Sequence, residues 1–411
     1  MNKTKLFHKD FTLVVIGQII SLFGNGIVRF SLPLYLLNQT GSATLFGMVT
    51  ALSFLPMILL TPLGGIVADR VNKRNVMVTL DFLTAILMLV FFLLLGKVDL
   101  VILLIVTLMI LYGIQGAYQP TVQASMPLLH GKENLLGANA IINQVSALAG
   151  LLAPIMGGIM FGLWGLKPII LVGGCCFFLS AMMELFITIP HTKTGEKQGI
   201  FEIVKEDFSQ SLSFMRKDKP IILKSILIIC GFNLFLSAML IVSMPVLITQ
   251  TLGMPDQLYG YSQGALAAGG LFGGIMVGVF AKKLNIKKVY LLLLATATLL
   301  LPISISLWLP LSPFRTYLVI SICCFLIMSV ATMITVQMLS FIQAETPMNL
   351  TGKVLSCALA LAMCAQPLGQ AMYGFLFDAF QRTPYYIVLG AAMISGGIAL
   401  LSKKVFQNMT S

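Results

Sequence analysis

The stretch GGIVADRVNKRNVM, residues 64–77, decides the fold. An apolar run ends at Asp69 and Arg70, the cations Lys73 and Arg74 follow at once, and a second apolar run comes next. A hydrophobic segment that stops at a short charged turn and then resumes is typical of a membrane hairpin. The basic turn predicts the cytoplasmic side, because Lys and Arg accumulate in short loops on that face.

The same stretch recurs 213 positions further along the chain, without a gap. The aligned pairs are Gly65 with Gly278, Asn72 with Asn285, Arg74 with Lys287 and, as a charge reversal, Asp69 with Lys282. A repeat at about half the chain length indicates two homologous halves. Parallel halves of this kind are the architecture of many secondary transporters.

Composition indicates a polytopic membrane protein. The 411 residues are 58% hydrophobic and 10% charged, with a mean hydropathy of +0.97, whereas a soluble domain carries roughly 25% charged residues. The net charge of +12 does not indicate nucleic-acid binding, because the basic residues lie in short loops between apolar runs. Of these, 21 lie on one side of the predicted spans and four on the other. That bias predicts both termini and the 191–220 loop in the cytoplasm.

Twelve apolar runs are long enough to cross the hydrocarbon, which takes about 20 residues. They cover 11–38, 43–69, 75–96, 100–127, 136–163, 167–190, 221–250, 257–281, 287–309, 314–341, 351–377 and 384–402. We expect an all-α protein with an N-terminal bundle over 1–190, a cytoplasmic linker over 191–220 and a C-terminal bundle over 221–411. Apolar residues every three to four positions predict an amphipathic helix in the linker. That helix lies either along the membrane surface or on the cytoplasmic ends of the spans.

The sequence gives no sign of enzyme chemistry. Its three histidines lack metal-ligand spacing, its seven cysteines include no CxxC pair, and no His, Asp and Glu cluster lies at span depth. We therefore expect no catalytic residue, no metal and no cofactor. The absence of a GxxxxGK[ST] loop argues against ATP as the energy source. A gradient must then supply the work.

The basic loop resembles the signature Gly-x-x-x-Asp-Arg-x-Gly-Arg-Arg of the major facilitator superfamily, and the resemblance covers the whole chain. Asn72 replaces the second glycine and preserves the turn if it adopts the positive φ that Asn tolerates. The stretch GLLAPIMGG around Pro154 is similar to the superfamily's antiporter signature. The stretch SLPLYLLNQTGSATLFG, residues 31–47, resembles the macrolide-efflux branch of multidrug exporters. The resemblance implies twelve transmembrane helices in two pseudo-symmetric six-helix bundles.

The fourth span departs from the pattern of proton-coupled relatives. Those proteins often carry Arg-x-x-Gln-Gly there, and this chain has YGIQG, with Tyr112 at the Arg position. Arg29 in the first span is a candidate for the missing charge. A charge at a helix centre costs about 2.5–3.5 kcal/mol, so it is expected to be paired or hydrated. The alternative is that Arg29 snorkels to the outer interface.

Polar side chains at span depth are the candidates for lining a substrate cavity. By depth these are Asn25, Arg29, Tyr112, Gln115, Gln119, Asn143, Asn233, Gln366 and Gln370. For each neutral amide the alternative is an interhelical hydrogen bond, worth roughly 0.6 kcal/mol.

The resemblance also implies a gate. Asp69 would meet the N-terminal dipole of span eleven near Gly352 and hold the cytoplasmic side shut; the alternative is that it only balances the adjacent cations. The other candidates for gating and conformational change are Gly65, Arg70, Lys73, Arg74, Asp81, Pro154, Gly157 and Gly158. We expect Asp81 to form an ion pair with Arg70, Lys73 or Arg74. Glu184 and Asp378 are expected at the membrane interfaces.

These observations predict a secondary active exporter of the cell membrane that moves amphipathic or hydrophobic organic compounds, drug-like or macrolide-like. Proton antiport with alternating access is the expected mechanism, with protons, membrane lipid and a small-molecule substrate as partners, no nucleic acid, and a monomeric state. Export of a siderophore or a lipid-like anion, with Arg29 binding the head group, is an alternative. Passive facilitation is another.

Overall fold

The computed structural model describes residues 6–130, 134–190, 200–280, 285–348 and 350–407, and omits the side chains of 62–70 and 200–204. Within these ranges the regular structure is helical, and twelve helical segments are long and apolar enough to cross a membrane. The chain forms two compact units. Unit 1 comprises Met1–Gln39 and Leu52–Ile200, and unit 2 comprises Thr40–Ala51 and Phe201–Ser411.

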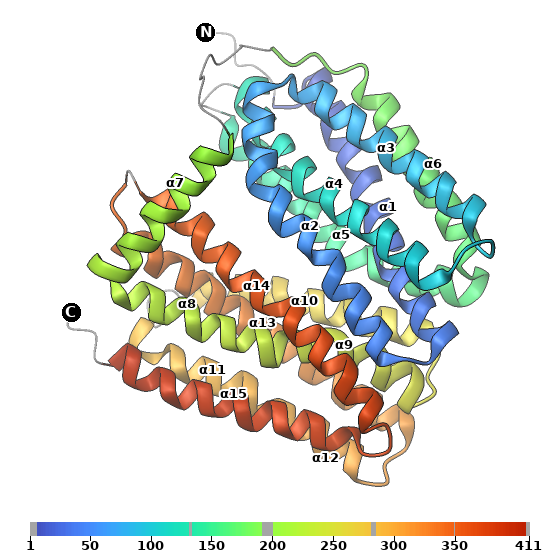
Figure 1. Cartoon of the computed structure of the whole chain (residues 1–411), viewed down its shortest axis with the longest axis vertical. Helices are drawn as coiled ribbons and strands as arrows, with labels where there is room; N and C mark the ends of the chain where they lie inside the picture. The colour runs from blue at the N-terminus through green and yellow to red at the C-terminus, as the bar shows by residue number, and fades with distance from the viewer. Residues whose placement is uncertain (1–5, 131–133, 191–199, 281–284, 349, 408–411) are drawn as a thin grey trace. The chain divides into compact units, whose positions relative to one another are not determined.

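Unit 1 contains almost all of the first six membrane helices (Figure 1). They are α1 (Lys9–Thr40), α2 (Ala43–Arg70), α3 (Lys73–Leu94), α4 (Leu100–Leu129), α5 (Leu135–Trp164) and α6 (Leu166–Glu184). The sequence marks their ends: Asp99 caps α4 by accepting the backbone N–H of Ile102 at 3.0 Å, and Gly165, with φ of 73°, separates α5 from α6. α3 and α6 lie side by side along their length.

Two of the six described membrane spans of unit 2, Pro220–Thr251 and Ile286–Trp308, are divided into shorter helices, and the other four are continuous. The helices of unit 2 are α7 (Ile200–Ser213), η1 (Phe214–Asp218), α8 (Pro220–Phe232), η2 (Asn233–Ser237), α9 (Ala238–Pro245), η3 (Val246–Thr251), α10 (Asp256–Phe280), η4 (Ile286–Lys288), α11 (Val289–Thr298), α12 (Leu300–Trp308), α13 (Pro313–Glu345), α14 (Thr351–Ala379) and α15 (Pro384–Gln407). The span over Pro220–Thr251 includes two π-helical turns, η2 and η3. Such turns interrupt the regular hydrogen-bond ladder of an α-helix.

The linker helix α7 packs on the start of α14. Lys353 of α14 forms an ion pair with Asp207 at 2.6 Å and donates to Gln210 at 3.0 Å. Of the two arrangements predicted for this helix, the structure supports packing on the ends of the spans. Residues 191–199, the start of the predicted linker, lie outside the described residues, and the exact limits of the linker stay a prediction.

The two repeated loops contain the same type of helix cap, formed by an asparagine side chain. Asn72 Oδ1 accepts the backbone N–H of Arg74 at 3.0 Å, and Asn285 Oδ1 accepts that of Lys287 at 2.9 Å. The predicted positive φ at Asn72 is wrong: its φ is −59°, and no described non-glycine residue has a positive φ. Asparagine is used here because its side chain caps the next helix, in both repeats.

The N-terminus of α2 belongs to unit 2, where Asp378 caps it from α14. The Asp378 carboxylate accepts the backbone N–H groups of Ala43 and Thr44 at 2.8 and 2.9 Å and the Ser42 hydroxyl at 2.8 Å. The first N–H groups of a helix lack partners within it, so a carboxylate there is stabilising. The expected interfacial position of Asp378 stays a prediction, and the structure adds that its oxygens bond to the start of α2.

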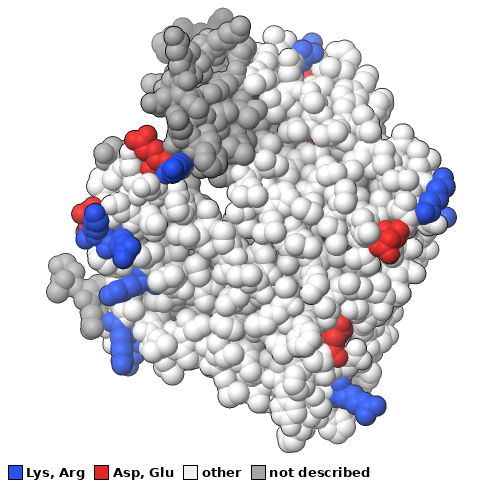
Figure 2. All heavy atoms as spheres, viewed as in Figure 1, with Lys and Arg blue, Asp and Glu red and all other residues white. Residues whose placement is uncertain are grey.

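Glycines allow close helix packing, which replaces the hydrophobic drive in lipid. In unit 2, a Cβ on Gly269 of α10 would lie 2.2 Å from the backbone oxygen of Phe325 in α13. In unit 1, a Cβ on Gly26 of α1 would lie 2.5 Å from Cβ of Ala153 in α5. Many large hydrophobic side chains are exposed in both units. Figure 2 shows broad uncharged areas, with Lys, Arg, Asp and Glu at few places.

Candidate substrate site

Arg29 reaches across unit 1 from α1 to α4. Its guanidinium donates a hydrogen bond to Oε1 of Gln115 and lies over the ring of Tyr112, with Cζ 3.6 Å from the ring centroid. The side chain therefore does not snorkel to the helix end. It lies beside Tyr112, the residue that takes the place of the arginine in the sequence pattern given above.

Aromatic rings surround this contact. Phe54 of α2 packs on Tyr112 with ring centroids 4.8 Å apart. A guanidinium over an aromatic face is attracted by the ring quadrupole, by about 0.5–2 kcal/mol. Among the described residues no carboxylate pairs with Arg29. The site thus combines a positive charge that lacks a counterion, an amide and two aromatic faces, which can bind an electron-rich or anionic group of an amphipathic molecule.

The remaining cavity candidates differ in their surroundings. Asn25, Gln119 and Gln366 are half-buried, whereas Asn143 is exposed. Asn233, at the start of the π-helical turn η2, donates from Nδ2 to the backbone oxygen of Ala362 in α14 at 2.8 Å. This is the interhelical hydrogen bond given above as the alternative for each amide. Gln370 is fully buried, and neither its amide nitrogen nor its amide oxygen has a partner among the described atoms.

The candidate antiporter stretch packs α5 against α1. Pro154 lies inside the continuous helix α5, and Gly157 and Gly158 are buried. A Cβ at Gly157 would lie 3.0 Å from the ring of Phe30 on α1, next to Arg29. The small residues of this stretch therefore set how closely α5 approaches the helix that carries Arg29.

The predicted ion pair of Asp81 with Lys73 or Arg74 is wrong. Asp81 is 2% exposed and accepts a hydrogen bond from Ser21 of α1, while the Arg74 guanidinium donates to the backbone oxygen of Leu185. Seven residues separate Asp81 from Arg74, which is about 10 Å along a helix. The side chains of the gate candidates Gly65, Asp69 and Arg70 lie outside the described residues.

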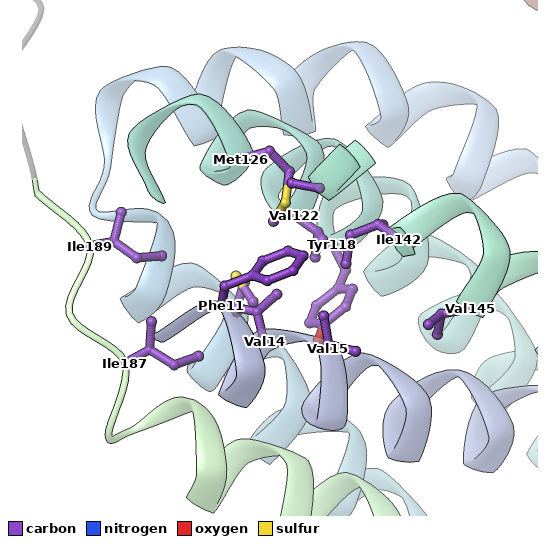
Figure 3. Close-up of a cluster of buried hydrophobic side chains, with 12 residues drawn as sticks. Phe11, Val14, Val15, Tyr118, Val122, Met126, Ile142, Val145, Ile187 and Ile189 are labelled. Atoms are coloured by element: carbon purple, nitrogen blue, oxygen red, sulfur yellow. The ribbon is translucent and has the colours of Figure 1, made fainter. Parts of the chain in front are cut away.

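Sequence reasoning missed a polar network at the same end of unit 1. Tyr118 was not among the candidates, and Glu184 was expected at a membrane interface. Both side chains are buried, and they are bonded to each other at 2.6 Å. Figure 3 shows Tyr118 among the apolar side chains of α1 and α4. The signal available in the sequence was Glu184 itself, an acidic residue in an apolar span.

Two further features lie elsewhere. A pocket of about 380 Å³ in unit 2 is lined by residues including Gln250, Asp378 and Arg382, and by none of the predicted cavity residues. In the described part of the chain, no group of three or more His, Cys, Asp or Glu side chains is placed to hold a metal ion.

Two apolar six-span units and a charged, aromatic site between helices of unit 1 define a polytopic membrane transporter. The model of the Major Facilitator Superfamily matches residues 14–358, and the chain belongs to this superfamily. It is therefore a transporter and not an enzyme.

Similar proteins include two efflux proteins and one solved structure. "Macrolide efflux protein A" of Streptococcus pyogenes is 22% identical over 398 residues, covering 96% of each chain. "Multidrug efflux pump Tap" of Mycolicibacterium fortuitum is 25% identical over 402 residues, covering 94% of this chain and 93% of that protein. The crystal structure of the nucleoside transporter NupG matches with a TM-score of 0.74 at 11% identity, over 97% of this chain and 99% of the other. This likeness confirms the predicted fold.

Proposed function

We propose that the protein exports amphipathic organic compounds across the cell membrane by proton antiport with alternating access. Relatives named for macrolide and multidrug efflux support the substrate class and the direction. The proposal includes a monomeric protein with both termini in the cytoplasm, as the bias of basic residues predicts. Work comes from the proton gradient, at about 2.3 kcal/mol per charge per 100 mV.

The observation that carries the proposal is the contact of Arg29 with Tyr112 and Gln115. A cation in an apolar span is costly and is retained where it has a task. Here its charge lies against an aromatic face that can stack on a flat or apolar substrate, with Phe54 beside it. Polar recognition on an apolar wall suits molecules with one polar end and a large hydrophobic body.

A second candidate substrate class is an anionic amphiphile, such as a lipid-like acid or a siderophore. The specific observation in its favour is that Arg29 contacts neutral groups and no carboxylate among the described residues. A substrate anion would then provide the counterion, with a charge-assisted bidentate contact.

Flux into inside-out proteoliposomes tests the proposal. Vesicles with an acidic interior receive radiolabelled erythromycin, ethidium or taurocholate, which are a macrolide, a cation and an anion. We expect uptake against the concentration gradient for at least one of them, abolished when the pH gradient is collapsed. Preference for taurocholate identifies the anionic class. Flux that ignores the pH gradient identifies a passive facilitator and contradicts antiport.

Variants of Arg29 link this flux to the site. Arg29→Gln removes the charge and should lower uptake of the preferred substrate strongly, whereas Arg29→Lys keeps the charge but loses the planar fork and should have an intermediate effect. The matched control is Arg382→Gln, which removes an exposed cation of unit 2. Equal uptake by Arg29→Gln and Arg382→Gln would contradict the role of Arg29.

The gate remains part of the proposal through Asp69, Arg70 and their neighbours in the signature loop. We expect Asp69→Asn to impair transport while membrane insertion stays normal, because a carboxylate is needed at a helix N-terminus to hold the gate. Full transport by correctly inserted Asp69→Asn would contradict the gate.

A further inference from the structure

Four helices of unit 1 bury a polar cluster that the substrate site does not use. From α4, the Tyr118 hydroxyl donates to Oε1 of Glu184 on α6 at 2.6 Å and accepts from Nε2 of Gln18 on α1 at 2.8 Å. From α3, Asp81 accepts the hydroxyl of Ser21 on α1 at 3.2 Å. These side chains are at most 4% exposed. The cluster therefore holds two carboxyl groups away from water.

No cation neutralises these carboxyl groups in the described part of unit 1. The ionisable side chains on or beside the packed helices are His8, Lys9, Asp10, Arg29 and Tyr35 at α1, Lys73 and Arg74 on α3, Lys97, Asp99, Tyr112, Tyr118 and His130 at α4, and Lys167, Cys175 and Cys176 on α6. Of these, Tyr118 alone has a hydrogen bond to either carboxyl group, and Arg74 bonds instead to the Leu185 carbonyl. An ionised, unpaired carboxylate in such a place costs several kcal/mol.

The cluster also has too few hydrogen-bond donors. Oδ2 of Asp81, Oε2 of Glu184 and Oε1 of Gln18 are buried acceptors with no partner among the described atoms. The hydroxyl hydrogens of Ser21 and Tyr118 already point to other carboxyl oxygens. Buried acceptors are normally satisfied. A proton on a carboxyl group removes the unpaired charge and adds the missing O–H donor, so the cluster fits the protonated form.

The position of the cluster limits its contact with water. Phe11, Val14, Val122 and Met126 are buried around Tyr118 and form an apolar layer with it (Figure 3). Gln18 and Ser21 lie about one turn apart on α1. Gln18 contacts Tyr118, which holds Glu184, and Ser21 contacts Asp81, so the two carboxyl groups belong to one cluster.

We propose that Asp81 and Glu184 form the proton-binding site of unit 1, and that its protonation and deprotonation couple the proton gradient to transport. Coupling rests on the antiport part of the proposed function. The chemistry is the transfer of a proton between water and a carboxylate oxygen, with an O–H bond formed on loading and broken on release. Tyr118 is a positioning residue that holds Glu184.

Proton occupancy can be tested without any substrate. Infrared spectra of the purified protein in detergent at neutral pH should contain a protonated-carboxyl C=O band that Asp81→Asn/Glu184→Gln loses. Each single variant should lose part of it. Asp99→Asn, which changes an exposed carboxylate at the start of α4, is the matched control and should leave the band unchanged. Identical spectra for the wild type and the double variant would overturn the proposal.

Coupling is tested in proteoliposomes with erythromycin. The double variant mimics a permanently protonated site, so exchange of internal for external erythromycin should persist while uptake driven by the pH gradient is lost. If the double variant misfolds, the single variants are measured in the same way. If the variants and the wild type both take up erythromycin when a pH gradient is imposed, the coupling role of Asp81 and Glu184 is overturned, but proton antiport is not. A wild type that transports but ignores the gradient overturns antiport, and with it the coupling role.

Discussion

Units 1 and 2 share an architecture but differ in what they bury. In unit 1, α3 and α6 enclose Asp81 and Glu184, the buried acidic side chains of the described chain. In unit 2 the third span contains α11 and α12, and the sixth span is α15. These helices, which correspond to α3 and α6, contain no Asp or Glu. There the buried polar groups are hydroxyls, such as Ser304, whose Oγ donates to the Tyr385 carbonyl at 2.9 Å.

This difference shows that the two repeats have specialised. The loops kept their asparagine caps, since both repeats need the same helix start. Among the described residues, the buried Asp and Glu side chains lie in unit 1. Unit 2 contains glycines such as Gly269, where a Cβ would meet the backbone of the neighbouring helix. We infer that unit 1 carries the charge-dependent chemistry and that unit 2 provides a closely packed partner.

The largest expected effect is on packing in unit 2. Gly269→Ala places a Cβ against a backbone oxygen that cannot move aside, and should destabilise by about 3 kcal/mol, the upper end for overpacking. Gly113→Ala in unit 1 meets the flexible end of Leu60 at 3.1 Å and should cost less than about 1 kcal/mol. Thermal unfolding in detergent checks the order. Gly274→Ala, with open space around it, is the control on the same helix.

The next effect compares buried hydrogen bonds. Tyr118→Phe leaves a carboxyl oxygen and an amide N–H without a partner and should destabilise by roughly 2 kcal/mol. Ser304→Ala in unit 2 removes one hydroxyl from a carbonyl and should cost about 0.5–1 kcal/mol. Unfolding of both variants in parallel measures the difference. Equal losses would mean that the polar contacts of the two units matter equally.

A smaller effect concerns acid pH. Burial, and then the neighbouring His8, lower the pKa of His130 below its ordinary 6.5; the two rings stack at 4.9 Å. The unfolded chain therefore binds a proton more readily, so stability from this site is present above about pH 6.5 and falls as the pH drops below it. Hydrogen exchange at pH 5.5 and 7.5 should show the loss near His130. In His130→Phe the pH dependence there should be weaker.

The smallest effect concerns an amide of unit 2. Asn233→Leu removes one interhelical bond and should destabilise by about 0.6 kcal/mol, with transport retained. Arg29→Gln, in unit 1, should instead impair transport with little loss of stability. Loss of flux in Asn233→Leu without unfolding would show that unit 2 also contributes to substrate binding.

The sequence predicted what depends on local pattern. Apolar run length gave the twelve spans, and the 213-residue repeat gave two asparagines that cap equivalent helices. A single charge in a span was expected to be paired or hydrated, and Arg29 indeed contacts Gln115 and Tyr112. Local pattern also explains the error at Asn72, where a residue tolerant of positive φ serves as a cap.

The buried carboxyl cluster could not be predicted in the same way. Asp81 was assigned to the cations a few residues before it, since sequence shows neighbours along the chain only. Its hydrogen-bond partner Ser21 lies on α1, 60 residues away, and Tyr118 and Glu184 are 66 residues apart. The rotation of each helix about its axis decides whether such groups face lipid, water or each other. A helix that is apolar on all sides has no amphipathic pattern from which this rotation can be predicted.

The cap on α2 has a consequence for biosynthesis. Ala43 and Asp378 are 335 residues apart, and at about 5–20 residues per second the ribosome needs on the order of tens of seconds to add the second after the first. During that time the first turn of α2 has no carboxylate to accept its N–H groups. Nascent chains stopped short of Asp378 should therefore be cut by proteases at this turn, and completion of the chain should protect it.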